Sequence, residues 1–97
     1  MYRSHHCGEL REHHIGIRAS LAGWIDTIRD HGGVKFIDLR DQSGVTQVVF
    51  NDDSMLEGLT RETAATVSGI VEARDKDNIN PKIKTGNIDL RADSIVS

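Results

Sequence analysis

The sequence predicts an all-β domain, a small five-stranded Greek-key barrel. Apolar and polar residues alternate in five stretches of the chain, as the two-residue period of a strand requires. The segments that carry helix-capping signals are short, so helices are expected only as minor additions. The 97 residues suffice for one such domain, residues 1–97, with a modest core, and leave no room for a second.

Composition narrows the class of protein. The formal net charge is −3, which argues against non-specific duplex binding, because that mode draws its affinity from neutralised phosphates. No run approaches the roughly 20 apolar residues that span a bilayer. The lone cysteine and the polar residues after Met1 favour the cytoplasm over a secreted, disulfide-linked domain.

The clearest element is a β-hairpin over residues 32–50. On its first strand Ile37 and Leu39 point to one face, which the apolar pair marks as the core side. A tight turn over residues 41–44 reverses the chain. The alternation then places Phe36 and Gln47 together on the face away from the core, where an aromatic ring beside an amide is typical of a surface that stacks and reads nucleobases.

The remaining elements follow from similar patterns. In chain order they are a short helix over 7–16, a strand over 18–29, a short helix at most over 51–59, a strand over 65–72, a long loop over 75–85 and a strand over 87–92. Trp24 has the wrong parity for the core, and Gly23 before it suggests a bulge that turns the indole inward. We therefore expect Trp24 in the core.

Three strands, a short helix and two further strands form the order of an OB-fold, whose second and third strands bind oligonucleotides. On that surface Phe36 would contribute roughly 1–3 kcal/mol per stacked base, and Gln47 would hydrogen-bond a base edge. Arg29 would pair with a phosphate or a base. A core position for Phe36 and an ordinary surface role for Gln47 remain open. Residues 74–84 are the best candidate for a phosphate contact.

Catalytic and metal motifs are absent from the sequence. It contains no nucleophile elbow, phosphate-binding loop or metalloprotease motif. His31 could act as a lone base, but nothing near it in sequence supplies a nucleophile. Four of the five histidines surround Cys7 without the spacing of a zinc site, so exposed, titrating histidines are expected. We expect no catalytic residue, no metal and no cofactor in this domain.

Several short segments, in the order in which they follow one another along the chain, resemble a known family. They are CGELR, LAGWI, RDHGGVKFIDLRDQSGVTQVVF, ARDKDNIN and TGNIDL. Together they resemble the N-terminal anticodon-binding domain of bacterial aspartyl-tRNA synthetases, over residues 3–97. The synthetases for lysine and asparagine keep the fold with a looser pattern. The resemblance implies an OB-fold that holds the anticodon loop of aspartate tRNA and reads its bases, above all the central uridine.

The same resemblance implies a role for each of five residues. Phe36 would stack on the central uridine, and Gln47 would hydrogen-bond an anticodon base. Arg29 would meet a base or the backbone. Asn78 would contact the first anticodon position, and Asp89, where the family usually has glutamate, would complete the pocket.

The chain departs from the family in charge. Residues 26–28 replace part of an arginine run, and Glu72 stands where a basic residue is common. Both changes remove positive charge near the expected RNA and predict weaker, more salt-sensitive binding.

The family's aminoacylating module, with its ATP and magnesium sites, lies C-terminal to this domain and is absent, so the chain alone is not expected to charge tRNA. The end at Ser97 suggests an excised fragment or a short gene product. The isolated domain is expected to be a monomer, and the parent synthetase a homodimer specific for aspartate tRNA or able to charge asparagine tRNA as well. A free-standing OB-fold for other single-stranded nucleic acid and a protein-binding barrel remain the alternatives.

Overall fold

A computed structural model describes residues 3–31, 34–50 and 58–96. Its strands are β1 (Arg18–His31), β2 (Val34–Asp41), β3 (Gly44–Phe50), β4 (Ala64–Ala73) and β5 (Ile88–Val96), with two short 3-10 helices, η1 (Glu12–His14) and η3 (Lys76–Asn78). No helix in the described part of the chain is long and apolar enough to cross a membrane.

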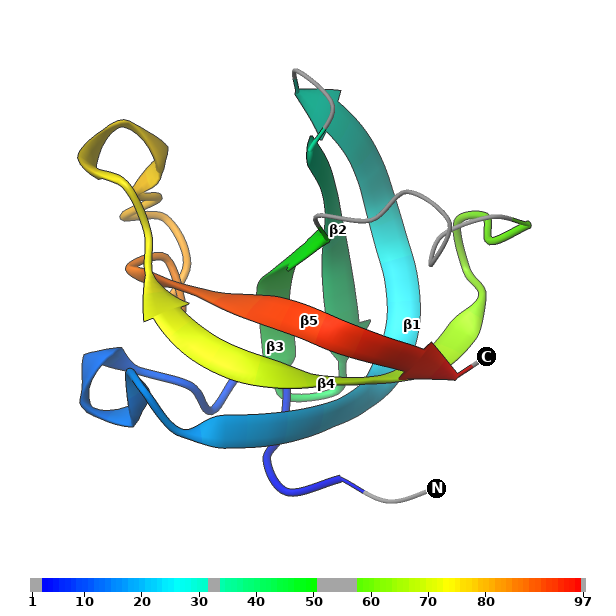
Figure 1. Cartoon of the computed structure of the whole chain (residues 1–97), viewed down its shortest axis with the longest axis horizontal. Coiled ribbons are helices and arrows are strands. Elements are labelled where there is room, and N and C mark those ends of the chain that lie inside the picture. Colours follow the sequence, from blue (N-terminus) through cyan, green and yellow to red (C-terminus); the bar gives the residue numbers. More distant parts are fainter. Residues whose placement is uncertain (1–2, 32–33, 51–57, 97) are drawn as a thin grey trace.

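The five strands close into a barrel in the order β1-β2-β3-β5-β4 (Figure 1). All pairings are antiparallel except that of β3 with β5, where Val48 lies opposite Leu90. The long, curved β1 belongs to two ladders, because residues 18–24 pair with β4 and residues 24–31 pair with β2. The predicted all-β, five-stranded OB-fold is confirmed.

The core lies where the alternation of the hairpin predicted it. Ile37, Leu39 and Phe50 are fully buried, and so are alternate residues of β4 and β5 such as Val67 and Leu90. Removing each such side chain from water contributes about 1.5–3 kcal/mol. The expected strands over 65–72 and 87–92 are confirmed as parts of β4 and β5.

The prediction for Trp24 is wrong, because its residue is 38% exposed. The irregularity in β1 falls between Ile25 and Thr27, so it comes after Trp24 and cannot turn the indole inward. Gly23 instead allows β1 to lie close to the backbone of β2. A Cβ at this position would lie 2.3 Å from the carbonyl oxygen of Arg40.

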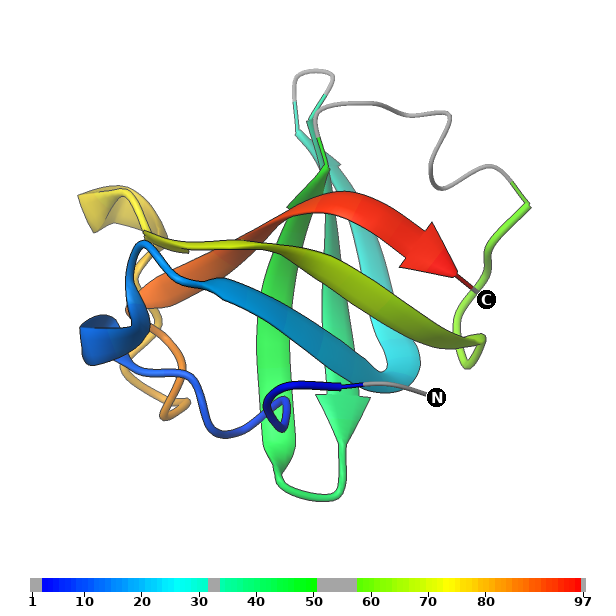
Figure 2. The ribbon, with the colours of Figure 1, turned by 60° about the horizontal axis from the view of Figure 1, so that its bottom comes forward.

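The short helix expected over residues 7–16 is present only as the three-residue 3-10 helix η1, so its extent was overestimated. Cys7 and Gly8 donate their backbone N–H groups to Asp41 Oδ2 (2.9 Å) and Ser43 Oγ (2.8 Å). These bonds join the N-terminal segment to the β2–β3 turn in place of bonds within a helix. In Figure 2 the segment crosses in front of β2 and β3.

The expected helix over 51–59 falls mostly outside the described residues, which resume at 58 with turns and irregular chain. The loop expected over 75–85 holds η3 and further turns, and residues 74–87 connect β4 to β5. In Figure 1 this connection extends from one end of the barrel.

Candidate nucleic-acid interface

A hydrogen-bonded network covers the outer face of β1, β2 and β3. Arg29 on β1 forms a two-armed ion pair with Asp38 on β2, with Nη1 2.8 Å from Oδ2 and Nη2 3.1 Å from Oδ1. Thr27 adds a hydroxyl bond to Asp38 at 2.7 Å. Because both arms of the guanidinium are engaged, its plane is fixed beside the third strand.

The amide of Gln47 on β3 lies between a cation and an anion. Its Oε1 accepts from Arg29 Nη2 at 2.9 Å, and its Nε2 donates to Asp89 Oδ1 at 2.8 Å. These two partners settle the orientation of the amide, and residue Gln47 as a whole is 8% exposed. One amide N–H and one oxygen lone pair remain for a ligand.

Asp89 is held in turn by a buried arginine just past the end of β4. Arg74 Nε lies 3.2 Å from Asp89 Oδ1 and donates to the carbonyl of Ile88 at 2.9 Å. Arg74 Nη1 donates to the carbonyl of Asn78 at 3.1 Å. One guanidinium thus joins the start of β5 to the end of η3.

Burial and pairing shift the pKa values of Asp89 and Asp38 in opposite directions. Burial raises the pKa of Asp89 to about 6, although Arg74 and Gln47 oppose the rise. Burial would also raise the pKa of Asp38, but the hydrogen bonds from Arg29 and Thr27 outweigh it and lower that pKa. Asp38 is therefore firmly ionised at neutral pH, whereas Asp89 is closer to its titration range.

A pocket of about 410 Å³ opens beside this network. It is lined by Arg29, Asp38, Arg40, Val45, Gln47, Arg74, Asp77, Asn78, Asn80 and Ile83. Amides and charges of both signs dominate the lining, and the arginine at position 40 is itself paired with Asp26 at 3.3 Å. Such a surface is suited to the hydrogen-bonding edges of a base more than to a row of phosphates.

The structure brings four of the five predicted residues together. Arg29, Gln47 and Asn78 line the pocket, and Asp89 bonds to Gln47. Phe36 does not line the pocket. It lies opposite Arg29 and Val49 in the strand register and outside the core cluster, on the face that the alternation predicted.

Two residues of the network were missed by the sequence reasoning. Asp38 is not among the site residues predicted from the sequence, although the alternation along its strand places it on the same face as Phe36. Arg74 was grouped with a candidate phosphate contact, but its side chain is 4% exposed and its bonds are internal. The phosphate prediction therefore fails for Arg74 and stays a prediction for the exposed Lys76, Lys82 and Lys84.

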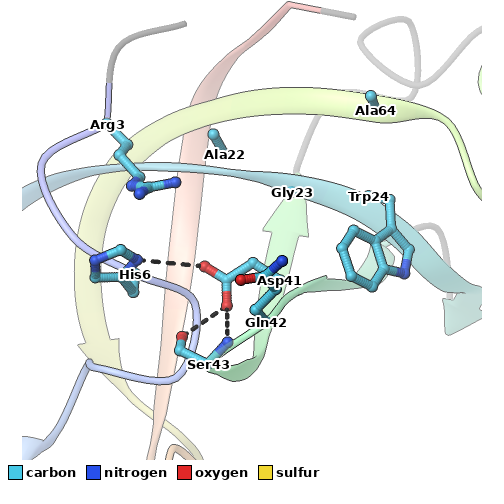
Figure 3. Close-up of a pocket in the computed structure, with 9 residues that line it drawn as sticks. All are labelled: Arg3, His6, Ala22, Gly23, Trp24, Asp41, Gln42, Ser43 and Ala64. Carbon is cyan, nitrogen blue, oxygen red and sulfur yellow. Dashed lines mark hydrogen bonds and ion pairs between the residues drawn. The ribbon is translucent and has the colours of Figure 1, made fainter.

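A second pocket, of about 710 Å³, lies near the β2–β3 turn (Figure 3). It is lined by Arg3, His6, Ala22, Gly23, Trp24, Asp41, Gln42, Ser43 and Ala64. Its carboxylate, Asp41, accepts from Ser43 N–H at 2.7 Å and from Cys7 N–H at 2.9 Å, with His6 at 3.8 Å. Since this carboxylate already holds the turn and the N-terminal segment, we place the functional site at the smaller pocket.

Three possible metal ligands gather near η1. Donor atoms of His5, Glu9 and His14 lie within 4.8 Å of one another. However, His14 Nδ1 accepts the backbone N–H of Arg11 at 2.9 Å, so in the neutral ring the other nitrogen carries the proton. This ring orientation offers no lone pair to a metal, and the expected absence of a metal stays a prediction.

Comparison with known families identifies the domain. The family model for the tRNA anti-codon OB-fold nucleic acid binding domain matches residues 19–96. The chain belongs to this family. The OB-fold domain is also similar to curated aspartate-tRNA(Asp/Asn) ligases, at 53% identity over 95 residues in Mycobacteroides abscessus and 48% over 98 residues in Acidiphilium cryptum. The two alignments cover 95% and 97% of the OB-fold domain, but only 16% of the length of each ligase.

Solved structures agree on the fold. Asparaginyl-tRNA synthetase from Pyrococcus horikoshii matches with a TM-score of 0.77 at 24% identity, over 94% of the OB-fold domain and 22% of the synthetase chain. An OBody bound to hen egg-white lysozyme matches with a TM-score of 0.81 at 22% identity, over 98% and 92% of the two chains. At these identities the likeness concerns the fold alone.

Proposed function

We propose that this OB-fold domain is the anticodon-binding module of an aspartate-tRNA ligase. Its curated relatives at about half identity are such ligases, and the OB-fold domain spans about a sixth of their length. The ATP and magnesium sites and the charging reaction belong, in this proposal, to the rest of a parent enzyme. The domain supplies the recognition of aspartate tRNA, in the cytoplasm.

The observation that carries the proposal is the oriented amide of Gln47 at the pocket. With Oε1 facing Arg29 and Nε2 facing Asp89, the amide keeps one donor and one acceptor for a ligand. A base edge with one acceptor and one donor, such as O4 and N3–H of uracil, matches that pair. An unpaired base can present this edge, whereas a base inside a duplex cannot.

The neighbouring residues supply the other contacts of a single-stranded loop. Phe36 stacks on the base that Gln47 reads, since both lie on the outer face of the β2–β3 hairpin. The exposed Asn78 at the end of η3 reaches the adjacent base across the pocket. Arg29, 38% exposed at its side chain, keeps a surface for a base or the backbone.

Local charge lowers the affinity of this module. Asp26 pairs with Arg40, and Glu72 pairs with Arg91 at 3.0 Å, so two arginines on the barrel are already neutralised. The sequence analysis predicts that this binding is more sensitive to salt, but fewer contacts with phosphates make it less sensitive. Counterion release scales with the phosphates neutralised, so fewer contacts give weaker binding with a shallower salt dependence.

A titration followed by fluorescence anisotropy tests the proposal. The probes are a labelled RNA stem-loop with the aspartate anticodon, the same stem-loop with its central uridine replaced, and an unrelated single strand. Wild-type protein should prefer the first. Phe36→Ala should weaken that complex by about 5- to 150-fold, the loss of one stacked base.

Trp24→Ala is the matched control, because it removes an exposed aromatic ring that lines the second pocket. It should leave binding unchanged. Equal loss of all three probes in Phe36→Ala would favour a general single-strand binder. Failure of wild type to bind any of them would refute the proposal and leave the protein-binding alternative.

A further inference from the structure

Arg74 is the most enclosed charge at the interface. Its side chain is 4% exposed, and its guanidinium contacts two segments: the Asp89 carboxylate and the carbonyl of Ile88 on β5, and the carbonyl of Asn78 at the end of η3. The backbone N–H of Arg74 also donates to the carbonyl of Asn87 at 3.0 Å. A buried arginine persists only where its charge and donors are satisfied in this way.

Each of these partners belongs to the recognition surface or adjoins it. Asp89 accepts from the amide of Gln47. The bond from Arg74 to the carbonyl of Asn78 holds the end of η3, whose residues Asp77 and Asn78 line the pocket. The connection from β4 to β5 is otherwise long and irregular over residues 74–87. The relative position of Asp89 and Asn78 therefore depends on this guanidinium.

We propose that Arg74 is a positioning residue, which holds Asp89 and the Asn78 turn as one rigid unit and thereby sets base discrimination in the pocket without contacting the nucleic acid. The inference rests on the proposed function and deepens it. Arg74 acts on selectivity, because loosening this unit lets the pocket adapt to a wrong base. It contributes nothing to phosphate binding, since its charge is enclosed.

Arginine is required for this role, and lysine cannot replace it. The planar guanidinium donates in several fixed directions at once, to Ile88 on one side and Asn78 on the other. The ammonium group of a lysine, on a shorter side chain, keeps the charge next to Asp89 but cannot donate to the carbonyls of Ile88 and Asn78 at the same time. Arg74→Lys thus separates positioning from charge.

The experiment measures discrimination and salt dependence together. Stem-loops with the aspartate anticodon and with its first base replaced are titrated against wild type and Arg74→Lys at several salt concentrations. We expect the ratio of the two affinities to fall about tenfold in Arg74→Lys, the loss of one charge-assisted hydrogen bond at the site. The slope of log Kd against log salt should not change.

Arg91→Lys is the matched control, because Arg91 is half exposed and pairs with Glu72 outside the pocket. It should leave the discrimination ratio as in wild type. Asp89→Asn gives a second test that does not depend on how Arg74→Lys folds. It should lower the same ratio, and the double variant should lower it no further, because the two residues act as one unit.

Two results would overturn the inference. One is an unchanged discrimination ratio in folded Arg74→Lys. The other is a salt slope that falls by about one, which would put Arg74 on a phosphate. If wild type itself fails to discriminate between the stem-loops, the proposed function falls instead, so the two failures are distinguishable.

Discussion

Asp89→Asn should stabilise the protein while impairing recognition. The Asp89 side chain is 14% exposed, and burial raises its pKa from 3.8 to about 6 in the folded state. Asparagine resembles the protonated acid, because it keeps an oxygen that can accept from Gln47 Nε2. The substitution therefore removes a carboxylate charge whose cost of burial exceeds its attraction to Arg74, while the carbonyls of Ile88 and Asn78 still accept from the guanidinium.

The magnitude and the pH window follow from that pKa. A rise from 3.8 to about 6 corresponds to about 3 kcal/mol. Below the unfolded value Asp89 is protonated in both states, so wild type and Asp89→Asn are equally stable. As pH rises toward 6, the folded protein holds a proton that the unfolded chain has lost, and wild type loses stability relative to the variant. Above pH 6 the difference is constant.

Urea denaturation followed by the fluorescence of Trp24, the single tryptophan, measures this difference at pH 4 and pH 7.5. The variant should gain about 0.5 kcal/mol at the lower pH and about 3 kcal/mol at the higher. Asp93→Asn is the control, because Asp93 is exposed and its hydrogen bond with Arg18 lowers its pKa. It should show no gain at pH 7.5. A stability of Asp89→Asn that equals or falls below wild type at pH 7.5 would refute the reasoning.

Three further predictions concern the core, the strand packing and the charge. Phe50→Ala should lower the free energy of unfolding by about 3–5 kcal/mol, because the ring is fully buried; a loss below 1 kcal/mol in urea denaturation would contradict its core position. Gly23→Ala should cost at least about 1–3 kcal/mol in the same assay, because the new Cβ meets the carbonyl of Arg40 at 2.3 Å; a neutral effect would show that the strands can separate freely. Glu72→Lys should tighten stem-loop binding and steepen its salt dependence by up to about one unit, which titrations at two salt concentrations would detect; an unchanged slope would place Glu72 away from the RNA.

The parts of the fold that a two-residue period controls could be predicted from the sequence. Ile37, Leu39 and Phe50 are buried, and Gln47 lies on the outer face, because the alternation along one hairpin decides all four positions. The succession of five strands along the chain follows from the same patterns. The site could be anticipated as far as it lies on that hairpin.

Features that depend on distant partners could not be predicted. The burial of Arg74 depends on carbonyls of residues 78 and 88, which meet only after the barrel closes. The N-terminal segment forgoes a helix because Asp41 and Ser43, more than 30 residues away, accept its N–H groups. The outward position of Trp24 depends on where β1 bends between its two ladders. No local pattern encodes these contacts.

The most direct test of the account is a two-dimensional ¹H–¹⁵N spectrum of the side-chain amides during a titration with the aspartate-anticodon stem-loop. Gln47 is at the proposed site, and Gln42 lines the second pocket near the hairpin turn and serves as the internal reference. The account predicts that the Gln47 amide signals shift with saturation while those of Gln42 stay in place. Signals of Gln47 that remain fixed while the stem-loop binds elsewhere would contradict it.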